Sequence, residues 1–281
     1  MITNKDAYRF TGFIPQVFLD NELLLGVACA EGDEIIGAAV VEPMEDNLTI
    51  RWIYVLEEYR NRGAGTMMID CISEMAKASE AEYLDIYFQP SKESYEGFFI
   101  KNDFLMSRTH PVYSFRLCDV TGSRFIRKNK QNLLPDDEHL YGYRNFEELP
   151  QNALDYIRDD MIMRNGTDYV PICCKKLSFA CGTWDHLMGY IVVIDDEQEK
   201  ELNVALIVST EANTFVAMEL LMLAGYRAYK SYPLSYKVSF AAVIDKVVPL
   251  TEKLLGTNSD MLKYVGDNLY GFRKVAEEDE L

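Results

Sequence analysis

The sequence lacks the features that mark membrane-spanning, exported and metal-binding proteins. Its apolar stretches, such as Tyr190–Ile194, are far shorter than the roughly 20 residues that cross a bilayer. The first ten residues contain no charged segment followed by an apolar one, so no export signal is visible. The six cysteines form no C-x-x-C pair, and the three histidines are scattered. We therefore expect a cytoplasmic protein without a metal site, whose cysteines are mostly buried thiols.

Basic residues are also scarce. The 281 residues include 28 Lys and Arg against 45 Asp and Glu, which gives a formal charge of −17. Nucleic acids are bound by clusters of positive charge, and a short basic stretch at 127–130 in an acidic chain is better explained as a solvated linker. We therefore expect no nucleic-acid or membrane partner. The acidic balance favours neutral or cationic small molecules.

The chain repeats itself, and its length allows two domains of ordinary size. Three short matches recur in the same order with nearly constant spacing. They pair 11–15 (TGFIP) with 167–171 (TDYVP), Ala28-Cys29 with Ala180-Cys181, and Tyr113-x-Phe115-Arg116 with Tyr270-x-Phe272-Arg273. We interpret the repeat as a duplication, with one domain at 1–120, a polar linker at 121–139 and a second domain at 140–281.

Strand and helix patterns alternate in the first copy. Strands are predicted at 23–29, 35–41, 48–56, 83–88 and 108–117, and helices are predicted to begin at 63–65 and to span 95–101. Apolar residues of the first helix recur at helical spacing, at Met67, Met68, Cys71, Ile72 and Met75. A strand, a glycine turn, a helix and a strand in succession imply a crossover between two parallel strands. We therefore expect an α/β (α+β) fold.

The segment 53–66 (IYVLEEYRNRGAGT) is the one that indicates chemistry. It is a strand, a short loop and a helix that begins with glycines. Unpaired amides and the helix dipole form an anion site there, Gly63 and Gly65 leave room for a diphosphate, and Arg60 and Arg62 add positive charge. A tight solvated turn is the alternative interpretation. No P-loop or dinucleotide-binding glycine motif is present.

This motif resembles the acyl-CoA signature of the GNAT superfamily of N-acetyltransferases, R-x-x-G-x-G, which here is 60–65 (RNRGAG). The stretch 98–104 (FFIKNDF) resembles a second element of that family, L-Y-x-K-x-G-F. The resemblance implies two tandem GNAT-like domains, each a mixed, mostly antiparallel twisted sheet with a splayed central parallel pair flanked by helices. It also implies that acetyl-CoA, as co-substrate, lies in the cleft of the first domain. The residues implied to bind it are Ile53, Tyr54 and Val55, through their backbone along the pantetheine arm, and Arg60, Asn61, Arg62, Gly63, Ala64, Gly65 and Thr66 at the pyrophosphate.

The implied activity is direct transfer of an acetyl group to an amine, and the chain departs from the family at the residue that protonates the leaving thiolate. Where the family has tyrosine this chain has Phe99, and Asp103 stands at a usual glycine. Tyr95, one helical turn earlier, is a substitute, with a packing role as the alternative. Tyr54 and Tyr113 are weaker candidates.

The amine must lose a proton before it attacks, and a carboxylate is the expected base. Glu42, Glu57 and the neighbouring Glu58 are the candidates, and solvated acids are the alternative. The expected acceptor is a small cationic amine such as a polyamine, an aminoglycoside or a lysine side chain. A CoA-binding sensor or scaffold without turnover is the competing hypothesis, because Phe99 cannot donate a proton. The sequence leaves a homodimer open.

The second copy has lost the phosphate motif. Aligned through Leu48 and Leu202, the positions of Arg60, Gly63 and Gly65 become Thr214, Ala217 and Glu219. The helix at 215–224 is apolar nearly all round and is predicted to be buried. We expect that this copy does not bind CoA, that it packs against the first copy and that it shapes the acceptor pocket.

Overall fold

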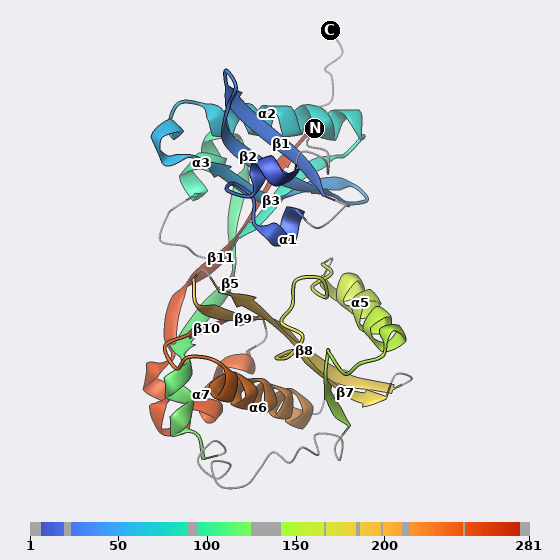
Figure 1. Cartoon of the computed structure of the whole chain (residues 1–281), viewed down its shortest axis with the longest axis vertical. Helices are drawn as coiled ribbons and strands as arrows, with labels where there is room; N and C mark the ends of the chain where they lie inside the picture. The colour runs from blue at the N-terminus through green and yellow to red at the C-terminus, as the bar shows by residue number, and fades with distance from the viewer. Residues whose placement is uncertain are drawn as a thin grey trace. The chain divides into compact units, whose positions relative to one another are not determined.

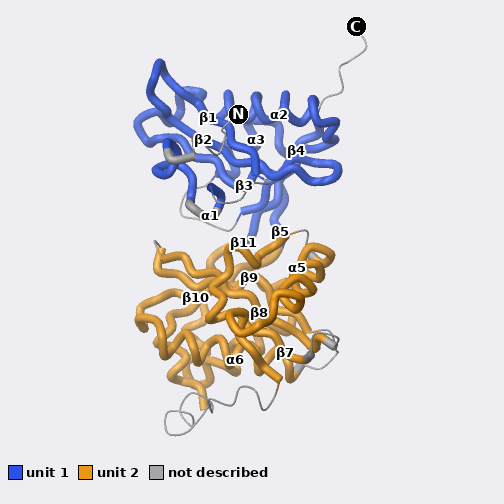
Figure 2. Tube along the Cα trace, turned by 45° about the vertical axis from the view of Figure 1, so that its right-hand side comes forward, with its two compact units in different colours: residues 1–109, 267–281 blue, residues 110–266 orange. Residues whose placement is uncertain are grey.

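The computed structural model describes residues 7–19, 24–88, 95–124, 142–165, 167–183, 186–197, 199–209, 214–243 and 245–275. The chain forms two compact units, one of residues 1–109 and 267–281 and the other of residues 110–266 (Figures 1 and 2). The predicted linker falls at 121–139, of which 125–139 lie outside the described residues. Within the described part of the chain, no helix is long and apolar enough to cross a membrane.

Unit 1 is a mixed sheet with helices on both faces (Figure 1). Its strands lie in the order β1-β2-β3-β4-β11-β5, and only the β3–β4 pair is parallel among the pairings seen there. The strands are β1 (Leu25–Glu31), β2 (Glu34–Pro43), β3 (Asn47–Val55), β4 (Tyr83–Phe88), β5 (Leu105–Arg116) and β11 (Lys263–Lys274). The helices are η1 (Ala7–Phe10), α1 (Gln16–Leu19), η2 (Glu57–Tyr59), α2 (Ala64–Ala78) and α3 (Glu96–Lys101).

Two apolar layers form the core of unit 1, one on each face of the sheet. Helix α2 buries Met68, Ile69 and Ile72 against strand residues such as Leu84 and Ile86. The α1 segment covers the other face of β2 and β3. The predicted helical stripe was wrong in part, because Met67 is 64% exposed and Cys71 is exposed as well. The stripe that meets the sheet is rotated toward Ala64, Ile69 and Ala76.

Unit 2 has the same arrangement. Its strands lie in the order β5-β10-β9-β8-β7-β6, with β9 and β10 parallel. They are the second part of β5, β6 (Tyr143–Asn145), β7 (Phe179–Thr183), β8 (His186–Asp196), β9 (Glu201–Ser209) and β10 (Lys237–Ala241). The helices are η3 (Leu117–Gly122), α5 (Gln151–Asn165), α6 (Thr214–Ser231), α7 (Val247–Leu255) and η5 (Gly256–Met261). Helix α6 is mostly buried, as predicted, but Phe215 near its beginning is 73% exposed.

The two units repeat each other down to their irregularities. In unit 1 the pairing of β2 with β3 shifts between Val40 and Val41, and in unit 2 the pairing of β8 with β9 shifts between Val192 and Val193. Gly37 and Gly189 mark a second equivalence. A Cβ at Gly37 would lie 2.8 Å from the carbonyl oxygen of Tyr54, and one at Gly189 would lie 2.5 Å from that of Val208. The structure therefore carries the predicted repeat, in a tandem fold of the expected α/β class.

The last strand of the chain joins the first unit. Residues 269–274 of β11 pair antiparallel with β4, so the unit that contains the phosphate motif is built from both ends of the chain. The predicted domain at 140–281 would have kept this strand with the second copy. Strand order depends on pairing between residues far apart in the sequence, for which the local pattern holds no signal.

Candidate functional site

The parallel strands of unit 1 separate at a bulge, as the predicted splayed pair requires. β3 pairs with β4 only over 47–50 and 83–86. On its other edge β3 continues to pair with β2, with Val41 opposite Ile50 and Val40 opposite Trp52, so Arg51 is an extra residue. A bulge bends its strand and ends pairing on one side. Residues 52–55 of β3 therefore have one edge without a strand partner in the part of unit 1 that the structure describes.

The peptide groups along that edge can be assigned from the pairing with β2. The amide of Leu56 donates to the carbonyl of Ile36 at 2.9 Å. Bonded and non-bonded pairs alternate along an antiparallel ladder, so Tyr54 also faces β2, while Ile53 and Val55 face the open edge. An extended ligand that pairs with β3 would thus meet Ile53 and Val55.

A short loop leads from this edge to the start of α2. Asn61 and Gly63 have φ values of 61° and 91°, in the left-handed region, and Gly63 is the residue before the helix. The amide of Met67 donates to the carbonyl of Gly63 at 2.9 Å. Within the described chain, the amides of Gly65 and Thr66 have no such acceptor, as expected for the first turn of a helix. They are available to an anion.

The two arginines of the loop have different surroundings. The Nε of Arg60 donates to the carbonyl oxygen of Val55 at 3.1 Å, and its guanidinium lies 5.8 Å from the ring centre of Tyr54. Arg60 thus holds the loop against the end of β3. Arg62 is exposed and lies 5.4 Å from the ring centre of Tyr59. Of the two, Arg62 is the one that solvent reaches most freely.

The two glycines of the motif also differ. A Cβ at Gly63 would meet no atom within 4 Å, whereas one at Gly65 would lie 2.9 Å from two ring carbons of Phe98. The space beside Gly65 that the sequence assigned to a diphosphate is therefore filled on the Cβ side by an α3 side chain. Gly65 lets α2 pack against α3, in addition to any ligand contact.

The candidate general acids lie in aromatic surroundings. Tyr95 is the residue before α3, is 41% exposed and makes an edge contact with Phe88 at 6.1 Å. Phe99 is 2% exposed and packs against Phe98 and Phe104. Tyr113 belongs to unit 2, where its ring stacks on Phe240 at 6.0 Å.

The candidate bases lie at separate places in unit 1. Glu57 and Glu58 are exposed in η2, directly after β3. Glu42 is paired with Arg51, whose Nε lies 2.5 Å from the Glu42 carboxylate. The arginine at the bulge thus fixes Glu42 on the sheet face opposite α2.

A carboxylate that the sequence analysis did not single out lies beside Glu42 on this face. Asp85 is in β4, in one row with Glu42 and Thr49, because Glu42 pairs with Thr49 and Thr49 with Asp85. One Asp85 oxygen accepts from Nδ2 of Asn47 at 2.6 Å, and the other is buried without a hydrogen-bond partner among the described residues. Burial raises the pKa of Asp85, against the lowering effect of its hydrogen bonds and of Arg51. An acid between the apolar residues Leu84 and Ile86 was the signal in the sequence.

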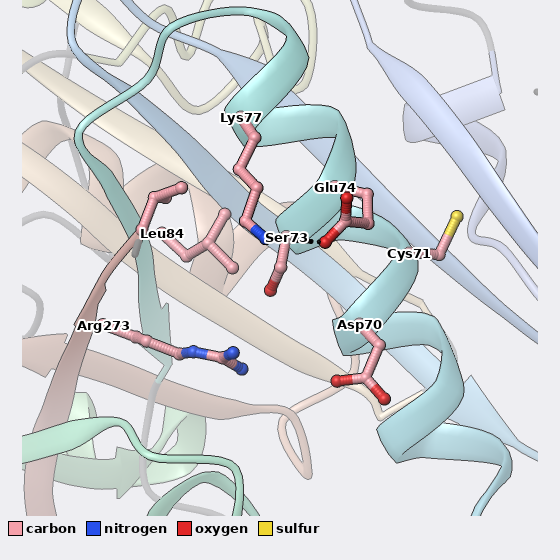
Figure 3. A pocket seen from close by; sticks show the side chains of 8 residues that line it. Asp70, Cys71, Ser73, Glu74, Lys77, Leu84 and Arg273 are labelled. Atoms are coloured by element: carbon pink, nitrogen blue, oxygen red, sulfur yellow. Dashed lines mark hydrogen bonds and ion pairs between the residues drawn. The ribbon is translucent and has the colours of Figure 1, made fainter. Parts of the chain in front are cut away.

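A cavity of unit 1 lies elsewhere. It has a volume of about 330 Å³ and lies between α2 and the strands β4 and β11, with Asp70, Glu74, Lys77 and Arg273 in its wall (Figure 3). Leu84, at the beginning of β4, also lines it. This cavity is at the opposite end of β4 from the point where β3 and β4 separate. In the described residues, no group of three or more His, Cys, Asp or Glu could hold a metal.

The position in unit 2 that corresponds to Gly65 is occupied by Glu219, which has a structural partner. Glu219 accepts a hydrogen bond from the hydroxyl of Tyr143, which is buried. Burial and this bond raise the pKa of Tyr143 well above its ordinary value. The acid that replaces Gly65 is therefore used within unit 2 to satisfy a core tyrosine.

Comparisons with known proteins agree with this geometry. Residues 21–104 match the family model of the acetyltransferase (GNAT) domain. No curated protein matches the chain. Among solved structures, a tandem GNAT protein from the clavulanic acid biosynthesis pathway is 13% identical with a TM-score of 0.62, over 98% of this chain and 88% of that one. A GCN5-related N-acetyltransferase from Anabaena variabilis is 14% identical with a TM-score of 0.55, over 98% and 67%. Residues 21–104 thus match the acetyltransferase (GNAT) domain, and the whole chain has the fold of tandem GNAT proteins.

Proposed function

We propose that unit 1 is an N-acetyltransferase that moves the acetyl group of acetyl-CoA directly to the primary amine of a small cationic acceptor. The observation that carries this proposal is the open edge of β3, which leads straight into a helix start with free amides. An extended pantetheine arm suits the peptide groups of Ile53 and Val55. The pyrophosphate suits the amides of Gly65 and Thr66, and the exposed Arg62 precedes them in the loop.

Acetyl transfer requires two proton transfers, one from the amine and one to the leaving thiolate. The amine nitrogen must lose a proton before it attacks the thioester carbonyl, since an aliphatic amine with a pKa of about 10.4 is almost entirely charged at neutral pH. The C–S bond then breaks and the thiolate takes a proton. Glu42 and Glu57 are the carboxylates proposed for the first transfer, and Tyr95 is proposed for the second.

A CoA-binding sensor or scaffold is the second candidate, and one observation favours it. Phe99 lies in a buried aromatic cluster with Phe98 and Phe104, and none of these side chains can protonate a thiolate. An enzyme would then depend on Tyr95 or on solvent for that proton. A sensor would need neither.

Two measurements test the proposal. Calorimetry with CoA and acetyl-CoA reports binding, and thiol release from acetyl-CoA with a panel of polyamines, aminoglycosides and lysine peptides reports transfer. We expect both binding and amine-dependent release. Binding without release for every amine would support the sensor, and absence of binding would refute both candidates.

A charge placed at the helix start locates the binding site. Thr66 is exposed in the first turn of α2, so Thr66→Glu adds a carboxylate where the pyrophosphate is proposed, without altering a buried side chain. We expect it to weaken CoA binding by about tenfold or more, since a charged contact contributes about 1.5–3 kcal/mol. Thr66→Gln, of the same length and without charge, is the control and is expected to bind nearly as the parent does.

A further inference from the structure

We propose that Asp85 binds the ammonium group of the acceptor, so that the sheet face opposite α2 in unit 1 selects amines that arrive as cations. This inference rests on the proposed function, because it names the substrate class of the same domain. Recognition of the acceptor is thereby assigned to a residue that lies outside the phosphate motif and is not one of the candidate bases Glu42, Glu57 and Glu58.

Asp85 lies close to the end of the pairing between β3 and β4. It pairs with Thr49, one residue before Ile50 and Ile86, the last pair before β3 and β4 separate. Its neighbours Leu84 and Ile86 pack in the core beneath α2, so Asp85 points to the opposite face. The carboxylate therefore lies next to the point where β3 and β4 separate, on the sheet face opposite α2.

The cation of the row, Arg51, acts on both acids but pairs directly with Glu42. Arg51 lies on Glu42, with 2.5 Å between a guanidinium nitrogen and the carboxylate. Hydrogen bonds from Asn47 and Thr49 lower the pKa of Asp85, and Asn47 donates to one of its oxygens. The other oxygen is buried and has no hydrogen-bond partner within the described residues. A buried carboxylate oxygen that lacks a donor is costly in free energy. An ammonium group has three N–H donors and the charge to remove that cost.

Aromatic side chains frame this carboxylate. Tyr83 and Tyr87 flank it on the same face of β4, and Phe272 of β11 lies opposite it. The Phe272 ring contacts those of Tyr83 and Tyr270 at 6.2 and 6.1 Å between centres. Tyr270 is paired with Tyr87 on this face, and burial and the Asp85 charge raise its pKa. Aromatic faces attract organic cations, so the surroundings suit an alkylammonium group better than a hydrated metal ion.

The second copy has its carboxylate on the neighbouring strand. The equivalent row of unit 2 is Ile194, Asn203 and Ser239, which are all uncharged. Nδ2 of Asn203 donates to the Ser239 hydroxyl at 3.0 Å, and that hydroxyl donates to Glu201, which stands where unit 1 has Asn47. Glu201 also accepts from Nζ of Lys237 at 2.8 Å. The carboxylate of unit 2 therefore has a cation and a hydroxyl of its own, whereas one oxygen of Asp85 has no donor among the described residues.

The variant Asp85→Asn tests the proposal, with Asp70→Asn as a matched control on exposed α2 surface. We expect Asp85→Asn to raise KM for a polyamine by about tenfold or more, since it removes a charge-assisted contact. KM for acetyl-CoA and for an arylamine, which is uncharged at neutral pH, should change less than about twofold. Equal effects on the charged and uncharged amines, or no effect on either, would overturn the assignment.

A binding measurement keeps this test separate from the proposed activity. Calorimetric titration of spermidine into the CoA-loaded protein, parent and Asp85→Asn, measures the ammonium contact without turnover. Loss of spermidine binding in the variant supports Asp85 even if no thiol is released. Equal binding by parent and variant, or no binding by the parent, overturns it.

Stability distinguishes a binding role from a structural one. Folding raises the pKa of Asp85, so its contribution to stability is present at acidic pH and is lost as pH rises through the folded-state pKa. The groups that face it are Glu42, Arg51, Tyr83, Tyr87 and Tyr270. We expect the Tm of Asp85→Asn at neutral pH to equal or exceed that of the parent, with the difference shrinking toward acidic pH. A lower Tm at neutral pH would mark a structural residue.

Discussion

Replacing Gly65 by alanine adds one methyl group at the contact between α2 and α3, and its effect can be worked from the structure. The new Cβ would lie 2.9 Å from two ring carbons of Phe98. Ordinary contacts between carbon atoms are about 3.5–4.0 Å, so either the ring or the helix must shift. Overpacking of this kind costs about 1–3 kcal/mol, and the helix propensity of alanine returns up to about 1 kcal/mol. We expect a net loss of about 1 kcal/mol.

A double-mutant cycle isolates the contact. Phe98→Leu removes the ring carbons that the Cβ would meet, so Gly65→Ala should cost less, or be favourable, in that background. The coupling energy should reach about 1 kcal/mol or more, measured by urea unfolding of the four proteins. Gly63→Ala is the control. It meets no atom within 4 Å but has a φ of 91°, so its cost is backbone strain that does not couple to Phe98.

Additivity would refute the reasoning. If Gly65→Ala and Phe98→Leu add within about 0.5 kcal/mol, the two groups are not in contact, and Gly65 serves the ligand alone. In that case Gly65→Ala should weaken CoA binding without lowering stability. Calorimetry on the same variants separates these results.

Two further substitutions test other parts of the chain. Glu219→Ala leaves the buried Tyr143 hydroxyl without its acceptor and should lower the free energy of unfolding by about 1–2 kcal/mol, while CoA affinity stays unchanged; a large loss of affinity would mean that unit 2 holds the cofactor. Asp103→Gly relieves a non-glycine residue with a φ of 64° after α3 and should raise stability by up to about 1 kcal/mol; a lower Tm would show that the Asp103 side chain makes a contact worth more than the strain.

Much of the local structure follows from the sequence because its causes are local. The strand predicted at 83–88 is β4, and the crossover from β3 through α2 to β4 is parallel as expected. β-branched and aromatic runs, glycine turns and helical periodicity act over a few residues each. The repeat could be recognised for the same reason, since each copy keeps its own turn and strand residues.

The orientation of side chains was harder to predict. Helix α2 has two apolar flanks, and the flank with Ile69 packs on the sheet while Met67 and Cys71 on the other flank are exposed. Nothing in the sequence indicates that the Nε of Arg60 donates to the carbonyl of Val55. Such contacts depend on the three-dimensional path of the loop and on the packing of the helix, which the local sequence does not specify.

The sequence by itself determined the class of the fold, the duplication and the helix start by which unit 1 resembles the GNAT acetyltransferases, because each depends on residues adjacent in the chain. The tertiary structure alone decided that β11 completes unit 1, that Phe98 faces Gly65 and that Asp85 keeps an oxygen without a donor. These features join residues far apart in the sequence. Their energies come from pairing, packing and burial, which exist only once the chain has folded.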